Sequence, residues 1–129
     1  MTRDEEREIE RQCSRLIALY ANLNDAGDWD AVAALYVEEG RMARPSDPDN
    51  WIEGRSAILE AFRARSPRKG RHICSNIVID VIDENHARSE CALTLFSEGA
   101  APKVGSFHDI FVRSPDGWRF AERRGSTAY

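Results

Sequence analysis

The chain has 129 residues, a length that fits one domain around one hydrophobic core, and we treat residues 1–129 as a single domain. Its composition, 42% hydrophobic and 31% charged, is typical of a chain that folds into a globule and stays in solution. The net charge of -4 and the lack of a dense Lys/Arg stripe argue against nucleic-acid binding, and no stretch approaches the roughly 18 apolar residues that span a bilayer.

The first part of the chain is predicted to be helical. Between Arg3 and Ala26, apolar residues recur at steps of three and four, so they form one stripe along a helix. Asp4 suits the positive end of this helix, and Gly27 supplies a left-handed cap just past its other end. The stripe consists of Ile9, Cys13, Leu16, Ile17, Tyr20 and Leu23.

A second, short helix is predicted to start at Asp28 and to run through Leu35. The Asp28 carboxylate can accept from the backbone N–H groups of the first turn, which have no partner inside the helix. The segment from Pro45 to Asn50 holds two prolines and is expected to be a loop. A third helix is expected from Gly54 to Arg65.

The second half of the chain is predicted to form strands. Four β-rich runs are separated by turn signals, and such short connections imply an antiparallel meander. A fifth, short strand is expected from Tyr36 to Ala43. Helices followed by strands indicate an α+β domain, with the helices on one face of the sheet. The four runs are Arg71–Ile82, His86–Ser97, Lys103–Arg113 and Trp118–Arg124.

The cysteines and the N-terminus bear on where the protein works. Cys13, Cys74 and Cys91 are an odd number with no CxxC or Cys/His metal spacing, so we expect reduced thiols and no bound metal. The N-terminal MTRDEEREIE is acidic and lacks the apolar core of a signal peptide. These features predict a cytoplasmic protein.

Four segments carry a family resemblance. They are YANLNDAGDWDAVAALY, WIEGRSAILEAF, RHICSNIVIDV and FHDIFVRSPDGWRFAERR, and in this order they resemble the signature segments of the SnoaL-like branch of the nuclear transport factor 2-like superfamily. The resemblance implies a cone-shaped roll in which N-terminal helices pack on a curved, mainly antiparallel sheet and enclose a pocket. Members include steroid isomerases, polyketide cyclases, scytalone dehydratase, lindane dehydrochlorinase and bile-acid dehydratases, so the fold alone does not settle the function.

The resemblance also implies a catalytic pair. In the dehydratase and dehydrochlorinase members, an Asp near the end of the first helix pairs with a His at the start of the first long strand, and Asp25 and His72 occupy the matching places. A neutral imidazole can take a proton at physiological pH, and a carboxylate on its other nitrogen fixes the tautomer and stabilises the imidazolium. The pair would thus support proton abstraction beside a leaving group.

The residues themselves leave the direction of both side chains open. Asp25 lies about 145° from the centre of the apolar stripe at 100° per residue, which by itself favours solvent. On the predicted strand, His72 faces away from Ile73, Ile77 and Ile79. Either this isoleucine face is the core and His72 points to water, or His72 faces a pocket and the isoleucines pack against another subunit. The resemblance favours the second interpretation, and with it a homo-oligomer, either a dimer or a trimer.

Further pocket residues are expected, although aromatic residues at such spacings more often belong to a core. A tyrosine near the catalytic Asp occurs in dehydratase relatives, which favours Tyr20. Arg123 and Arg124 point to opposite faces of the last strand, so one of them at most enters the cone. The candidate substrate-binding residues are Tyr20, Trp51, Phe62, His108 and Arg123.

We therefore expect a lyase or isomerase that acts on a small hydrophobic or cyclic molecule and needs neither metal nor redox cofactor. One alternative is a non-catalytic small-molecule-binding domain, and another is a small subunit like that of ring-hydroxylating dioxygenases. A local basic run is either a solvated loop or a site for an anionic substrate tail. That run consists of Arg63, Arg65, Arg68, Lys69 and Arg71.

Overall fold

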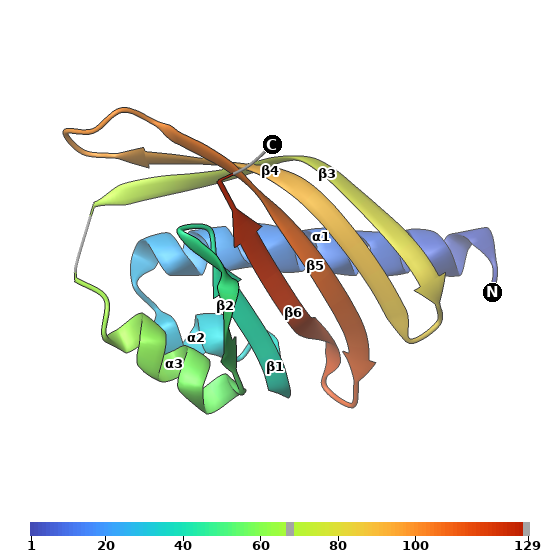
Figure 1. The fold of residues 1–129 in the computed structure, drawn as a ribbon. Coiled ribbons are helices and arrows are strands. Elements are labelled where there is room, and N and C mark those ends of the chain that lie inside the picture. The colour runs from blue at the N-terminus through green and yellow to red at the C-terminus, as the bar shows by residue number, and fades with distance from the viewer. Residues whose placement is uncertain (67–68, 128–129) are drawn as a thin grey trace.

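The computed structural model describes residues 1–66 and 69–127, in which two helices are followed by two strands, a third helix and four further strands. Figure 1 shows the long helix α1 lying along one face of a curved six-stranded sheet. This arrangement confirms the predicted α+β class. The elements are α1 (Arg3–Ala26), α2 (Trp29–Ala33), β1 (Tyr36–Arg44), β2 (Asp47–Glu53), α3 (Arg55–Arg63), β3 (Gly70–Asp83), β4 (His86–Ser97), β5 (Lys103–Ser114) and β6 (Gly117–Ser126).

The caps of α1 explain where this helix begins and ends. The backbone N–H of Glu5 donates to Thr2 Oγ1 at 3.1 Å, and the Thr2 N–H donates back to the Glu5 carboxylate at 3.0 Å. Gly27 ends the helix in the left-handed conformation, with φ 71°. The predicted stripe faces the sheet, since its buried members are Ile9, Cys13, Leu16, Ile17 and Tyr20.

The two short helices lie near the C-terminal end of α1 (Figure 1). Asp28 caps α2 as predicted, with its side chain accepting from the Ala31 N–H, but the helix ends at Ala33 rather than at Leu35. The third helix, α3, follows Gly54, and it runs from Arg55 to Arg63, two residues short of the predicted end.

The sheet has the strand order β2-β1-β6-β5-β4-β3. The strands β3, β4, β5 and β6 form the predicted antiparallel meander. The predicted short strand β1 pairs in parallel with β6, so the sheet is mixed but mainly antiparallel. The connection that makes this parallel pairing possible runs from β1 through β2 and α3 to the far edge strand β3.

A strand replaces the loop that was predicted from Pro45 to Asn50. The strand β2 starts at Asp47 and pairs antiparallel with β1 after a two-residue turn, so that Arg44 lies opposite Asp47. Pro48 lies inside β2, and a proline is tolerated there because β2 forms one edge of the sheet. The loop prediction was therefore wrong for residues 47–50, because their turn-forming composition is also compatible with an edge strand.

A bulge in β3 corrects the predicted strand faces. Asn76 has φ 53°, and the pairing with β4 gains one residue on β3 between Ser75 and Val78. Before the bulge His72 faces inward and Ile73 is exposed, as predicted. Beyond it the alternation is shifted by one, so Ile77 and Ile79, which were expected to share the face of Ile73, instead pack against the core. Val81 packs there too.

The hydrophobic core fills the space between α1 and the sheet. Side chains of α1 such as Ile17 meet aromatic residues of β5 and β6, among them Phe111 and Phe120, all of them fully buried. These two rings lie 4.9 Å apart between centroids. Within the described residues, no helix is both long and apolar enough to cross a membrane.

Candidate active site

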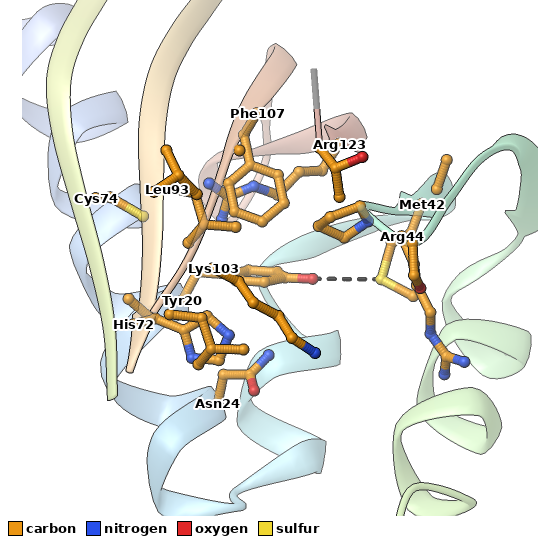
Figure 2. A pocket seen from close by; sticks show the side chains of 18 of the residues that line it. Tyr20, Asn24, Met42, Arg44, His72, Cys74, Leu93, Lys103, Phe107 and Arg123 are labelled. Carbon is orange, nitrogen blue, oxygen red and sulfur yellow. Dashed lines mark hydrogen bonds between the residues drawn. The ribbon is translucent and has the colours of Figure 1, made fainter. Parts of the chain in front are cut away.

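A cavity of about 160 Å³ opens between α1, α3 and the sheet. Apolar side chains such as Leu93 and Phe107 and polar ones such as Asn24, His72 and Arg123 line it together, as Figure 2 shows. The described side chains in its wall come from every strand except β2. They include Tyr20, Ala21 and Asn24 of α1, Met42, Ala43 and Arg44 of β1, Phe62 of α3, Arg65, His72 and Cys74 of β3, Leu93 and Leu95 of β4, Lys103, Val104 and Phe107 of β5, and Arg123 of β6.

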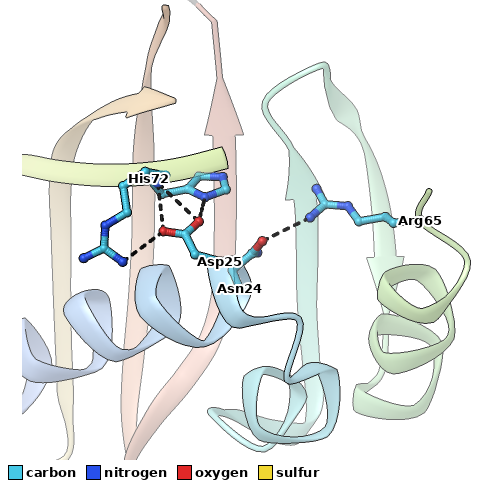
Figure 3. A network of polar contacts seen from close by, with 5 residues as sticks. Asn24, Asp25, Arg65 and His72 are labelled. Carbon is cyan, nitrogen blue, oxygen red and sulfur yellow. Dashed lines mark hydrogen bonds and ion pairs between the residues drawn. The ribbon is translucent and has the colours of Figure 1, made fainter. Parts of the chain in front are cut away.

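Asp25 and His72 meet at the edge of this cavity (Figure 3). The contact joins His72 Nδ1 to Asp25 Oδ1 at 2.5 Å. Asp25 is held in place by the backbone N–H of His72, which donates to its Oδ2 at 3.0 Å, and by Arg71 at 3.4 Å. The side chain of Asp25 is 9% exposed and that of His72 is 13% exposed, so little water competes for the contact.

The last turn of α1 and the start of β3 position this pair. Gly27 ends α1 directly after Asp25, and the carboxylate there reaches the first residues of β3. His72 lies in the cavity wall, whereas Asp25 lies behind it in a neighbouring hollow of about 290 Å³. His72 and Arg65 contribute to both spaces. The carboxylate thus contacts the imidazole from this neighbouring hollow, and it is not part of the described lining of the first cavity.

A buried ion pair holds Arg123 in the cavity wall. The guanidinium of Arg123 lies 3.1 Å from the Asp109 carboxylate, and both side chains are at most 1% exposed. Ser89 donates its hydroxyl to the other Asp109 oxygen at 3.1 Å. Burial opposes the charge on Arg123, but the negative charge of Asp109, together with Tyr20, Cys74 and Cys91, raises the pKa of Arg123. Arg123 is therefore a permanent cation inside the protein.

Aromatic rings surround this cation. The Arg123 guanidinium carbon lies 3.8 Å from the ring centroid of Phe107 and 4.4 Å from that of Tyr20. The Tyr20 hydroxyl contacts the Tyr36 hydroxyl at 2.9 Å and donates to the Met42 sulfur at 3.4 Å. Burial raises the pKa of Tyr20, so its hydroxyl keeps its proton.

Cys74 is a wall residue that the sequence did not single out as functional. Its thiol lies beside Cys91, and a hydrogen bond from Cys91, helped by the charge of Arg123, lowers the pKa of Cys74 to about 7. The same contact, followed by burial, raises the pKa of Cys91. The sequence could have indicated this role through position alone, because Cys74 lies two residues after His72 and therefore on the same face of the strand.

The structure brings together most of the predicted site residues. Tyr20, Phe62, His72 and Arg123 line the cavity, with Asp25 directly behind His72. Arg124 points the other way and binds Asp49 at 2.8 Å, so Arg123 is the arginine of β6 that faces inward.

Two predicted residues lie elsewhere. The side chain of His108 is 59% exposed on the outer face of the sheet, 3.4 Å from Glu90. Trp51 lies on the edge strand β2, where Arg41 stacks on its ring at 3.9 Å. Neither residue belongs to the described lining of the cavity. His108 follows Phe107 in β5, so its side chain points to the opposite face of the sheet. Trp51 belongs to β2, the strand that was not predicted from the sequence.

The basic run is also divided by the structure. Arg63 pairs with Asp30 at 2.8 Å and Lys69 with Glu98 at 4.0 Å, whereas Arg65 lies in the cavity wall and donates to Asn24 at 3.5 Å (Figure 3). Arg68 lies outside the described residues. No group of three or more His, Cys, Asp or Glu side chains suited to a metal ion occurs in residues 1–66 and 69–127.

Comparisons with known proteins agree with this fold. The SnoaL-like domain family matches residues 5–124. A proposed scytalone dehydratase from Novosphingobium aromaticivorans superposes with a TM-score of 0.86 at 22% identity, covering 99% of this chain and 89% of that one. An NTF2-like protein with a cystatin-like fold from the same species gives 0.80 at 24% identity over 92% and 81%.

A third solved structure, a proposed dehydratase of the NTF2-like family from Streptomyces avermitilis, superposes with a TM-score of 0.79 at 15% identity, over 92% of this chain and 96% of that one. No curated protein sequence matches the chain. At these identities the structural likenesses establish the fold, and the chemistry has to be argued from the site.

Proposed function

We propose that this chain, which belongs to the SnoaL-like domain family, is a lyase or isomerase in which His72 removes a proton from a small apolar molecule in the cavity. The observation that carries the proposal is the 2.5 Å contact between His72 Nδ1 and Asp25 Oδ1 at the cavity wall. A base needs an orienting partner on its other nitrogen, and this pair has that geometry.

The proton path follows from the tautomer. Donation of Nδ1–H to Asp25 leaves the lone pair on Nε2, which makes Nε2 the base. A C–H bond beside a carbonyl breaks, its proton moves to Nε2, and its electron pair begins a carbon–carbon double bond. In an elimination, a hydroxyl on the next carbon leaves with the C–O electron pair and takes the proton from the imidazolium to form water. In an isomerisation, the proton returns to another carbon of the substrate.

Asp25 stabilises the charged state of His72 in this scheme. Its negative charge lies next to the imidazolium that forms, and the backbone N–H of His72 fixes the carboxylate before the reaction. Because both side chains are nearly buried, the attraction between them is stronger than it would be in water. The pair is therefore arranged for a charge that develops during proton transfer.

Tyr20 is suited to polarise the carbonyl of the substrate. Its hydroxyl donates to a Met42 thioether, which is a weak acceptor, and a carbonyl oxygen in the cavity would be a stronger one. The Arg123 charge lies 4.4 Å from the Tyr20 ring and favours negative charge that develops on the nearby oxygen. We assign Tyr20 as the donor to the enolate oxygen.

Catalysis can be tested with cyclic β-hydroxy ketones as probes. In deuterated water, mass spectrometry follows deuterium uptake beside the carbonyl, and ultraviolet absorbance follows formation of the conjugated ketone. Loss of the base in His72→Ala should slow both by about 10²–10⁴-fold. Asp25→Asn should also lower the rate, and the double variant should be little slower than the slower single variant, because the two residues act as one unit.

The matched control is His108→Ala, which removes an exposed imidazole from the outer face and should keep the wild-type rate. Circular dichroism checks that each variant is folded. A folded His72→Ala protein that works as fast as His108→Ala would eliminate His72 as the base, whereas a wild-type protein that binds these ketones without turnover would favour a non-catalytic binding domain.

A further inference from the structure

The cavity wall holds a thiol that the proposed proton transfer does not use. Cys74 lines the cavity from β3, and Figure 2 shows its side chain pointing from that strand toward Leu93. Cys74 is half-buried, whereas Cys13 is fully buried and Cys91 is 4% exposed. Among the described residues of the cavity wall, Cys74 supplies the single thiol, so it is the cysteine that a small molecule in the cavity would meet.

Two neighbours favour the thiolate form of Cys74. The Cys91 thiol donates a hydrogen bond to the Cys74 sulfur, and the charge of Arg123 attracts the anion, so the pKa of Cys74 falls to about 7 although burial opposes this. Burial raises the pKa of Cys13 to about 12, and the contact with Cys74 raises that of Cys91. The thiolate is the nucleophilic form of cysteine, so Cys74 is the reactive thiol of the three.

Arg123 supplies buried hydrogen-bond donors to the same cavity. Its side chain is 1% exposed, Asp109 lies against its Nε at 3.1 Å, and the ring of Phe107 covers the guanidinium at 3.8 Å. Within residues 1–66 and 69–127, Nη1 and Nη2 have no oxygen or nitrogen atom as hydrogen-bond acceptor. A buried N–H without an acceptor is costly, so a ligand that brings an oxygen to these atoms is stabilised there.

The rest of the wall sets the size of such a ligand. It contains apolar side chains, among them Met42, Leu93, Leu95 and Phe107. A volume of about 160 Å³ is close to that of an apolar protein cavity that accepts one benzene molecule, about 150 Å³. The cavity therefore has room for about one six-membered ring.

The thiol and the guanidinium together indicate the chemical class of the ligand. A nucleophilic sulfur needs an electrophilic carbon, and the free N–H groups of Arg123 need an acceptor oxygen. An α,β-unsaturated carbonyl compound carries both groups, because its β-carbon is electrophilic through conjugation with the carbonyl. Cys74 and Arg123 line one cavity and interact with each other, so a single small molecule can meet both.

We propose that Cys74 is a covalent binding site for ring-sized α,β-unsaturated carbonyl compounds, whose carbonyl oxygen accepts from Nη1 and Nη2 of Arg123. The Cys74 thiolate forms an S–C bond to the β-carbon, the π electrons of the C=C bond move toward the oxygen, and the enolate takes a proton from water at its α-carbon. No group leaves, and no oxidant is needed. Negative charge develops on the oxygen during this addition, and the buried Arg123 cation stabilises it. The step does not use His72 as a base, so the inference goes beyond the proposed function and does not depend on it.

The reagent 2-cyclohexenone tests the site, with cyclohexanone as an unreactive compound of nearly the same shape. Intact-protein mass spectrometry should show the addition of one molecule per chain, and peptide mapping should place it on Cys74. At pH 7, Cys74 should react about tenfold faster in the folded protein than in urea, where the three cysteines should react alike. Cyclohexanone should slow the reaction of the folded protein, because it occupies the same cavity.

Cys13→Ala is the matched control, because it removes a thiol outside the described lining of the cavity and should leave the reaction unchanged. Cys74→Ser should abolish the adduct, and circular dichroism checks that both variants are folded. Equal rates in folded and unfolded protein, no protection by cyclohexanone, or an adduct that persists in Cys74→Ser would overturn the inference.

Iodoacetamide separates a reactive thiol from a site for the carbonyl compound. If iodoacetamide alkylates Cys74 in the folded protein but 2-cyclohexenone does not, the thiolate is present without the carbonyl site, and the inference is wrong. The His72→Ala protein should still form the adduct with Cys74. An adduct in a protein that shows no His72-dependent turnover would contradict the proposed function and leave this inference standing.

Discussion

The ion pair between Asp109 and Arg123 should be a major determinant of stability, because removal of either partner leaves a charge buried without its counter-ion. Both groups are fully buried, so the energy at stake is the cost of an unpaired charge in the interior. Asp109→Asn keeps the shape of the side chain and an acceptor for the Ser89 hydroxyl, and it removes the negative charge beside the guanidinium. The substitution isolates the charge on Arg123 from the packing around it.

Removal of one partner of a buried pair costs about 3–5 kcal/mol. For a domain of 129 residues, this corresponds to a fall of roughly 10–20 °C in Tm. The matched control is Glu122→Gln at the Arg41–Glu122 pair, which has a similar 2.9 Å contact but side chains that are 31% and 38% exposed. That variant should cost less than about 1 kcal/mol. Urea unfolding and thermal melting measure both.

A double substitution distinguishes the charge from the space that it fills. Asp109→Leu combined with Arg123→Met removes both charges and keeps much of the volume, so it should be more stable than Asp109→Asn alone. If Asp109→Asn lowers the free energy of unfolding no more than Glu122→Gln does, the Arg123 guanidinium contacts water or another partner in the variant. The reasoning from a fully buried ion pair is then wrong.

Two further predictions concern the surface and the thiol. Ile73 and Phe96 are each more than 40% exposed on the outer face of the sheet, so we expect a homo-oligomer that Ile73→Lys dissociates. Sedimentation of the wild-type protein as a 14.6 kDa species at micromolar concentration would contradict this. Alkylation of Cys74 by iodoacetamide should rise with pH around a midpoint near 7, because the thiolate reacts and the pKa is lowered, and Cys91→Ala should move that midpoint upward, as a pH series of mass spectra would show.

Much of the fold could be predicted because the local signals agree with the packing. The Arg3–Ala26 helix has an apolar stripe, an acidic first turn and a glycine cap, and all three point to the same bounds. The strand β2 could not be predicted in this way. Its proline and its acidic residues are typical of a loop, and an edge strand tolerates both because half of its backbone groups face no neighbour.

The site was less accessible to the sequence than the fold. Position in the chain, together with the family resemblance, indicated Asp25 and His72, and the structure places them in contact. Nothing in the sequence links Lys103 to Arg65. Lys103 starts β5, Arg65 follows α3, and the two residues are 38 positions apart. They line the same cavity because α3 packs beside the sheet. The charge of a cavity is a property of tertiary structure.

The bulge at Asn76 explains how one strand can serve both the cavity and the core. In a regular strand, residues an odd number of positions apart face opposite sides, so an inward His72 would force Ile77 and Ile79 outward. The extra residue at Asn76, held with φ 53°, shifts the alternation by one. His72 then faces the cavity while both isoleucines face the core, on the same side of the sheet. The sequence left open whether His72 or the isoleucines face the interior. In the folded protein, both do.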